Sequence, residues 1–117
     1  MGIEYEGKTS FTRDELDFLG VKEFTIPKKI DYKFNEGELL QEITNYINAT
    51  YSEHYSKSKF QATEFIIDAG HGDGFCIGNV MKYAQRYGKK NGYNRADLLK
   101  IIHYAIIELH VHDKEGR

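Results

Sequence analysis

Apolar residues recur at helical spacing over most of this chain, and that periodicity restricts the fold more than any other feature. Leu39, Leu40, Ile43, Tyr46 and Ile47 follow the i, i+3, i+4, i+7 pattern of one helix face. The pattern predicts a helix over about 37–51, and similar reasoning predicts helices over about 58–69, 75–87 and from Asn94 onward. We therefore expect a mainly α fold, a small bundle of three or four helices.

The N-terminal part of the chain is patterned differently. Thr12 and Glu15 form a capping box and Gly20 is a stop signal, so we expect a short helix over about 13–19. Apolar residues then alternate with other residues on both sides of Pro27, which predicts two short strands or an extended arm: Phe24, Ile26, Ile30, Tyr32 and Phe34. We expect a partly β N-terminal arm over 1–35 and a helical, nucleotide-binding-like region over 36–113, within a single domain overall.

Composition limits the class of protein. The 117 residues are 40% hydrophobic, which is enough to bury a core, and the single Cys76 excludes an internal disulfide and a cysteine-based zinc site within one chain. No stretch approaches the roughly 18 apolar residues of a membrane span. The N-terminus lacks the basic and apolar regions of a signal peptide. We expect a cytoplasmic protein with no membrane contact.

The last predicted helix has a wide apolar face. Asn94 is its expected N-cap and Asp97 occupies the N3 position. Its apolar face comprises Leu98, Leu99, Ile102, Ala105, Ile106 and Leu109. Apolar faces on several helices of so short a chain predict a homo-oligomer.

Positive charge is concentrated in one segment of an otherwise nearly neutral chain. Residues 82–100 hold six basic residues and one acidic residue, whereas the whole chain carries a net charge of −2. A helical wheel places Phe75, Asn79, Lys82 and Arg86 on one stripe of the third helix. The opposite residues are expected to face the core: Cys76, Val80, Ala84 and Tyr87.

Such a stripe suits a polyanion. Arg86 can bind phosphate in a bidentate manner, Lys82 supplies a point charge, Asn79 can contact a base or ribose, and Phe75 can stack on a base. The alternative is an ordinary solvated helix face.

Two glycine-rich turns flank the third helix. Gly70–Gly74 is either a phosphate-binding turn or a tight interhelical turn with Asp73 as N-cap, and the spacing of a P-loop is absent. In the second turn, Gly88–Gly92, Lys89 and Lys90 either complement a helix C-terminus or close over a bound phosphate.

Carboxylates and histidines offer weaker signals. Glu38 with Glu42 and Glu64 with Asp68 are pairs at i, i+4 spacing that can hold Mg²⁺ or simply face solvent, and Glu64 is expected to be half-buried. Each isolated histidine is expected to be structural.

An ordered series of residues resembles a small phage-encoded family often called SaV-like, which includes the C-terminal region of the T7-type phage nucleotide kinase. The series covers residues 54–107 and contains the string GN-x-x-KY-x-x-R-x-GKK. Its members here are His54, Tyr55, Glu64, Phe75, Cys76, Gly78, Asn79, Lys82, Tyr83, Arg86, Gly88, Lys89, Lys90, Asp97, Leu98, Lys100 and Tyr104.

The resemblance implies a helical nucleotide-binding phage protein in the cytoplasm of an infected bacterium. It implies a transferase, a nucleotide kinase moving phosphate from a deoxynucleoside triphosphate to a deoxynucleoside monophosphate. Lys82, Arg86 and Asp97 become the candidate catalytic residues, with Mg²⁺ as a candidate cofactor. Candidate nucleotide-binding residues are Phe75, Asn79, Tyr83, Lys89, Lys90 and Tyr104.

The cysteine-rich N-terminal region of that kinase has no counterpart here, so whether the chain is an enzyme stays open. One alternative is a non-catalytic phage protein that sequesters a nucleotide signal or inhibits a host protein. A second is an all-α nucleoside triphosphate pyrophosphatase, against which the absence of E-x-x-E and E-x-x-D motifs argues. Nucleic acid is a less favoured partner because the rest of the chain is acidic.

Overall fold

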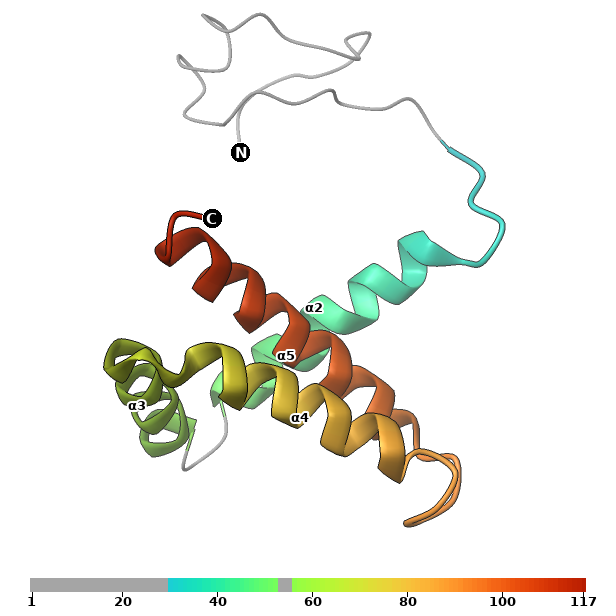
Figure 1. Cartoon of the computed structure of the whole chain (residues 1–117). Helices are drawn as coiled ribbons and strands as arrows, with labels where there is room; N and C mark the ends of the chain where they lie inside the picture. The colour runs from blue at the N-terminus through green and yellow to red at the C-terminus, as the bar shows by residue number, and fades with distance from the viewer. Residues whose placement is uncertain (1–29, 53–55) are drawn as a thin grey trace, which may run out of the picture. The chain divides into compact units, whose positions relative to one another are not determined.

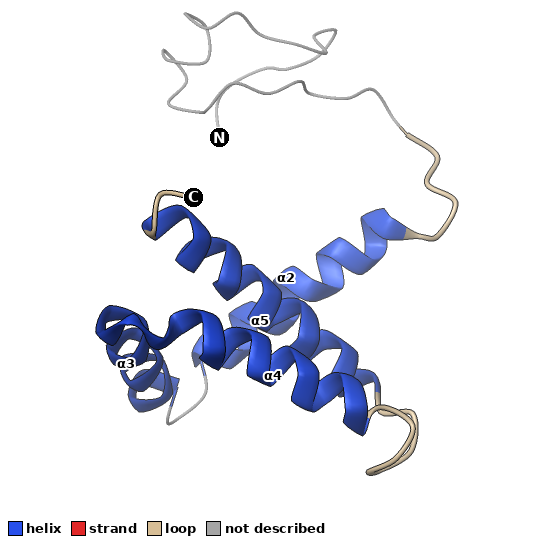
Figure 2. Cartoon of the chain, in the orientation of Figure 1, coloured by secondary structure: helices blue, strands red, loops and turns tan. Residues whose placement is uncertain are grey.

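Four α-helices form the described part of the protein. The computed structural model describes residues 30–52 and 56–117, and these residues contain no strand (Figure 2). In chain order the elements are α2 (Glu36–Ser52), α3 (Ser56–Ile66), a π-helical turn (Ile67–His71), α4 (Gly72–Arg86) and α5 (Arg95–Lys114). The mainly α fold and the helices predicted over 37–51, 58–69 and 75–87 are confirmed.

The chain divides into two units, Met1–Asn35 and Glu36–Arg117, and every described helix belongs to the second. Residues 30–32 are irregular and a turn follows at Lys33 and Phe34. Of the two predicted alternatives for this segment, a second strand or an extended arm, the strand is therefore wrong. Asn35 then adopts a left-handed conformation with φ of 64°, and α2 begins at the next residue. The helix predicted over 13–19 and the first strand lie outside the described residues.

The antiparallel pair α4 and α5 forms the centre of the helical unit, and α2 crosses α5 (Figure 1). Its small core consists of Ile67, Cys76 and Val111, with Phe75 and Ile107 packed against it. Cys76 is fully buried, as predicted, and burial raises the pKa of its thiol to about 11. Cys76 therefore acts as a packing residue.

Aromatic contacts attach α2 to α5 and join α3 to α2. The rings of Tyr46 on α2 and His103 on α5 meet edge to face, with centroids 6.0 Å apart. The ring of Tyr51 on α2 stacks on that of Phe60 on α3, with centroids 4.2 Å apart. Arg95 at the start of α5 makes a bidentate contact with Glu42 on α2, at 2.6 and 2.8 Å. These contacts fix α2 across the N-terminal half of α5.

The predicted turn over Gly70–Gly74 is much shorter in the structure. Gly70 alone leaves the helical region, with φ of 92°, and α4 begins at Gly72. Asp73 is not the N-cap, because it lies inside the first turn and accepts two hydrogen bonds from Arg117, at 2.6 and 3.1 Å. One left-handed glycine suffices to redirect the chain, so helical hydrogen bonding resumes at once.

The side of α4 that faces the core differs from its prediction, and the apolar face of α5 is exposed. Ala84 and Tyr87 were expected to face the core but are exposed, whereas Arg86 is partly buried. On α5, Leu98, Ile102 and Leu109 are 39%, 41% and 63% exposed. The reason is that α4 and α5 contact each other partly through aromatic and ionic side chains, which a hydrophobicity pattern does not detect.

The turn after α4 requires glycine at position 88. Gly88 has φ of +85°, and a Cβ there would lie 2.7 Å from the Tyr93 ring. We expect Gly88→Ala to lower the free energy of unfolding by about 1–2 kcal/mol, the cost of a left-handed alanine, plus the displacement of Tyr93. Urea denaturation followed by circular dichroism measures this loss.

Gly78→Ala is the matched control, since Gly78 lies within α4 with nothing near its virtual Cβ. That substitution is expected to raise the free energy of unfolding by about 0.5–1 kcal/mol. An unchanged stability in Gly88→Ala contradicts the proposed need for glycine.

Candidate functional site

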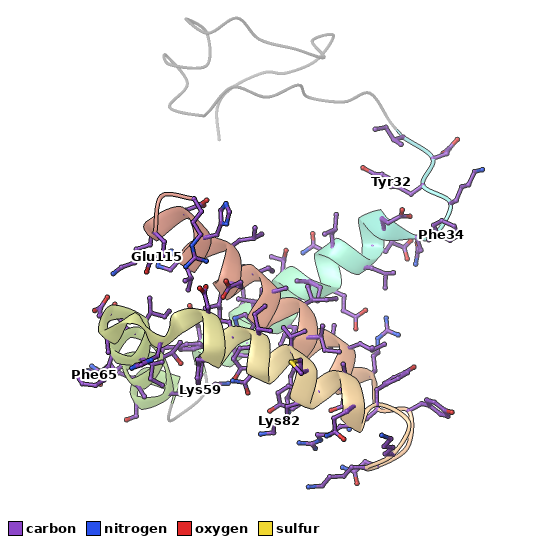
Figure 3. All side chains as sticks on the ribbon, in the orientation of Figure 1. Tyr32, Phe34, Lys59, Phe65, Lys82 and Glu115 are labelled. Atoms are coloured by element: carbon purple, nitrogen blue, oxygen red, sulfur yellow. The ribbon has the colours of Figure 1, made fainter. Side chains whose placement is uncertain are left out.

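Three cations surround the ring of Tyr83 on α4, and we call Lys82, Tyr83, Arg86 and Lys100 the Tyr83 cluster. Lys82 Nζ lies 5.2 Å from the ring centroid, Arg86 Cζ 5.3 Å and Lys100 Nζ 5.0 Å. Lys82 projects into solvent from α4 (Figure 3), whereas Lys100 approaches from α5. Neighbouring positions on two antiparallel helices thus concentrate positive charge around one aromatic ring.

An aromatic ladder supports the cluster from inside. Tyr104 on α5 stacks on Tyr83 with ring centroids 6.1 Å apart, and it meets Phe75 edge to face at 5.9 Å. Burial raises the pKa of Tyr104, so its phenol stays neutral near neutral pH. The ladder holds the Tyr83 ring in place and packs Phe75 against the core instead of on an exposed stripe.

Arg86 and Asp97 form a loose, buried ion pair between α4 and α5. Arg86 Nε lies 3.9 Å from Asp97 Oδ1, and the two side chains are 22% and 2% exposed. Arg86 Nε and Asp97 Oδ2 are both buried without a hydrogen-bond partner. A buried carboxylate needs an opposite charge nearby, so Asp97 holds the Arg86 guanidinium at the cluster.

The turn after α4 places Lys89 and Lys90 near the same end of the helix pair. The backbone N–H groups of both lysines donate to the Arg86 carbonyl, at 2.8 and 3.2 Å, and Gly88 N–H donates to the Gly92 carbonyl at 3.0 Å. These amides are engaged within the turn. The turn therefore offers a ligand the two exposed lysine side chains rather than a nest of free N–H groups.

Asn79 is also engaged locally. Its side-chain amide donates to the Phe75 carbonyl at 2.8 Å, one helical turn earlier. It is partly buried on α4, between Phe75 and the Tyr83 cluster. The sequence-based prediction that Asn79 contacts a base or ribose remains a prediction.

The acidic residues are poorly arranged for a magnesium site. Magnesium prefers several oxygen ligands in octahedral geometry, but Asp97 is a single carboxylate turned to a guanidinium. No cluster of three or more potential metal ligands occurs among the described residues. Glu42 and Asp68 are bound to Arg95 and Lys114. These side chains do not fit a protein-held Mg²⁺, so no step is derived through one.

A cavity of about 800 Å³ lies elsewhere, among α2, α3 and α5. Its apolar lining includes Ile47, Phe60 and Ile67, and the buried His103 borders it. Burial and then the nearby Lys59 lower the pKa of His103, so its neutral form is favoured. None of the candidate catalytic and nucleotide-binding residues predicted from the sequence lines this cavity, whereas the carboxylate pair Glu64 and Asp68 does. Glu64, expected to be half-buried, is exposed.

The structure brings Lys82, Tyr83, Arg86, Asp97 and Tyr104 together at one end of the α4–α5 pair. It also adds Lys100, which sequence analysis did not select as a site residue. The available signal was its position three residues after Asp97 and four before Tyr104, which places all three on one side of α5.

Comparison with known proteins gives a family match without an activity. A family model described as a protein of unknown function (DUF3310) matches residues 49–106, which span α3, α4 and part of α5. No curated protein and no solved structure matches the chain. Each described helix is too short or too polar to cross a membrane.

Proposed function

We propose that the Tyr83 cluster, with Lys89 and Lys90, binds the phosphate groups of a nucleotide. The observation that carries the proposal is the convergence of three cationic groups on one ring, at 5.0 to 5.3 Å. Arginine and lysine in combination are the usual phosphate-binding side chains of proteins. The sequence resemblance independently points to a nucleotide as the carrier of that phosphate.

The contrast with cations elsewhere in the molecule supports this assignment. Arg95, Lys114 and Arg117 each meet a carboxylate at 2.6 Å. Within the described residues, no carboxylate lies within ion-pair distance of Lys82, Lys89, Lys90 or Lys100. Carboxylates therefore neutralise these three cations, whereas the lysines of the Tyr83 cluster, like the exposed Lys57 and Lys59 on α3, have no such partner in the described part of the chain.

Repulsion between the cations of the cluster favours the binding of an anion. Like charges near one ring repel one another. Each cation–π contact at an exposed site offsets about 0.5–1 kcal/mol of this repulsion. Asp97 compensates Arg86 only, at 3.9 Å. A phosphate between the cations would relieve the remaining repulsion and gain charge-assisted hydrogen bonds.

The activity proposed for this site is phosphoryl transfer from a deoxynucleoside triphosphate to a deoxynucleoside monophosphate, giving two diphosphates. Lys82, Arg86 and Lys100 would neutralise the charge that develops on the transferred group. Asp97 would act as a positioning residue through Arg86. Any Mg²⁺ would arrive bound to the nucleotide phosphates, and the setting proposed is the cytoplasm of a phage-infected bacterium.

A second function is a non-catalytic phage protein that sequesters a nucleotide signal. The observation that favours it is the burial of Asp97, whose side chain is 2% exposed and faces Arg86. A carboxylate in this position is poorly placed to accept a proton from a substrate. Binding by such a protein would be tight and stoichiometric, without turnover.

Product analysis tests the catalytic proposal. The protein is incubated with dGMP or dTMP and a deoxynucleoside triphosphate, with and without Mg²⁺, and the nucleotides are separated by anion exchange. Diphosphates that disappear in Lys82→Ala but persist in Lys57→Ala, an exposed lysine on α3, support a kinase. Release of pyrophosphate identifies a pyrophosphatase instead. Unchanged nucleotides contradict the enzyme and leave binding as the property to measure.

A further inference from the structure

One face of α5 is apolar and uncovered in the helical unit. Leu98, Ile102, Ile106 and Leu109 are 39%, 41%, 41% and 63% exposed, and Ala105 between them is exposed as well. The spacing from 98 through 102 and 105 to 109 alternates between four and three residues, which is the pattern of a helix-to-helix seam. We call these five residues the Leu98–Leu109 face.

The helices packed against α5 leave most of this face free, although Ile106 at its edge also lines the cavity among α2, α3 and α5. α4 lies along one side of α5 and α2 crosses another side (Figure 2). The contacts with α4 form the Tyr83 cluster and the core around Cys76, and α2 contacts α5 through Tyr46 and Glu42. The side chains of α5 that meet α4 and α2 include Asp97, His103 and Val111, which are 1%, 6% and 1% exposed. The Leu98–Leu109 face points between these contacts.

Charges of opposite sign mark the two ends of the face. At about 100° per residue, Arg95, Leu98, Ile102, Leu109 and Asp113 fall within about 60° of one another around α5. Arg95 lies at the N-terminal end, with its side chain 63% exposed, and the exposed Asp113 lies at the C-terminal end. The face is thus apolar in the middle, with an exposed acidic residue at one end and, at the other end, an arginine that already binds Glu42.

We infer that the Leu98–Leu109 face binds the same face of a second copy of this chain, with the two α5 helices antiparallel. A two-fold axis near residue 104 would place Leu98 opposite Leu109 of the other copy, and Ile102 opposite Ala105 and Ile106. The same axis brings Arg95 opposite Asp113. Every contact then occurs twice, as an isologous interface requires.

Charge complementarity selects the antiparallel copy among the possible occupants. A parallel copy would set Asp113 against Asp113, which is repulsive, and would bring no carboxylate of the other copy to Arg95. In the antiparallel arrangement both ends are attractive, and the helix dipoles are also opposed. Arg95 already binds Glu42, so its guanidinium would bridge two carboxylates, one from each copy.

Disulfide cross-linking in the full chain tests the orientation. Ala105 is offset from its symmetry mate by about 3–5 Å along the helix and Leu98 by about 17 Å, given a rise of about 1.5 Å per residue. A disulfide needs Cα atoms about 4.4–6.8 Å apart. We expect Ala105→Cys to form a covalent dimer under mild oxidation, and Leu98→Cys alone or Leu109→Cys alone to form little.

An equal mixture of Leu98→Cys and Leu109→Cys should then cross-link efficiently. The native Cys76 is buried, so it does not compete. Efficient cross-linking of Leu98→Cys with itself would indicate a parallel pair and would overturn the proposal.

Sedimentation equilibrium provides the second test. The wild-type chain is expected at twice its monomer mass, and Ile102→Glu is expected as a monomer with unchanged helical circular dichroism. Asp113→Lys should weaken the dimer measurably. A wild-type monomer, or a dimer that persists in Ile102→Glu, overturns the proposal and assigns the face to another occupant.

Discussion

Replacing Arg86 by methionine is expected to lower the free energy of unfolding by about 3 kcal/mol. Methionine replaces the unbranched aliphatic part of the arginine side chain but carries no charge. The substitution therefore leaves the Asp97 carboxylate, whose side chain is 2% exposed, without a counter-charge. Removal of one partner from a buried ion pair costs about 3–5 kcal/mol, and the 22% exposure of Arg86 favours the lower end. Urea denaturation followed by circular dichroism measures the change.

The double variant Arg86→Met/Asp97→Leu is the control. It removes both charges, so it should recover much of the stability that Arg86→Met loses, because a buried pair can often be replaced by apolar residues. If the stability loss of the double variant equalled the sum of the losses in Arg86→Met and Asp97→Leu, Arg86 and Asp97 would not interact. A loss below about 1 kcal/mol in Arg86→Met would likewise contradict the structural role of the pair.

Reversing the two outer charges of the Tyr83 cluster is expected to abolish nucleotide binding. Lys82→Glu/Lys100→Glu removes two charge-assisted contacts, each worth about 1.5–3 kcal/mol, and adds two repulsive charges. We therefore expect the affinity for a deoxynucleoside triphosphate to fall by about 100-fold or more. Isothermal titration calorimetry measures the loss. These lysines are preferable to Arg86 because neither compensates a buried acid.

Lys57→Glu/Lys59→Glu makes the same change in net charge on α3, where both lysines are exposed. This control variant should bind with nearly wild-type affinity. Equal losses in the two variants would mean that net charge, rather than the geometry around Tyr83, governs binding.

The helices could be predicted because their signals are local. Apolar periodicity in α2, the left-handed Gly88 and the Asn94 cap, whose side chain accepts a hydrogen bond from Ala96 N–H at 3.0 Å, each act within a few residues. The prediction of a loop over 70–74 was wrong because the several glycines suggested a long turn, whereas the left-handed Gly70 makes the kink.

The packing of α5 could not be predicted in the same way. Its most apolar side is exposed, whereas Asp97, His103 and Tyr104 are turned inward. Hydrophobicity cannot show that a carboxylate is buried when its counter-charge comes from another helix. Nor can one chain show whether an exposed apolar face is covered in an assembly.

The candidate site was predicted in part. Clustered basic residues pointed to the end of α4, where Lys82 and Arg86 meet Tyr83. The contribution of Lys100 depends on the pairing of α4 with α5, and the inward position of Phe75 depends on Tyr104. Both are tertiary contacts, which spacing along one helix does not contain.

Amide chemical-shift mapping tests the central claim most directly. An isotope-labelled full-length chain is titrated with a deoxynucleoside triphosphate, and in parallel with inorganic triphosphate, while its backbone amide spectrum is recorded. Phosphate binding at the Tyr83 cluster predicts saturable shifts concentrated in residues 82–90 and 97–104 with both ligands. Shifts concentrated around the cavity at Phe60 and His103, or no saturable shift with either ligand, would contradict it.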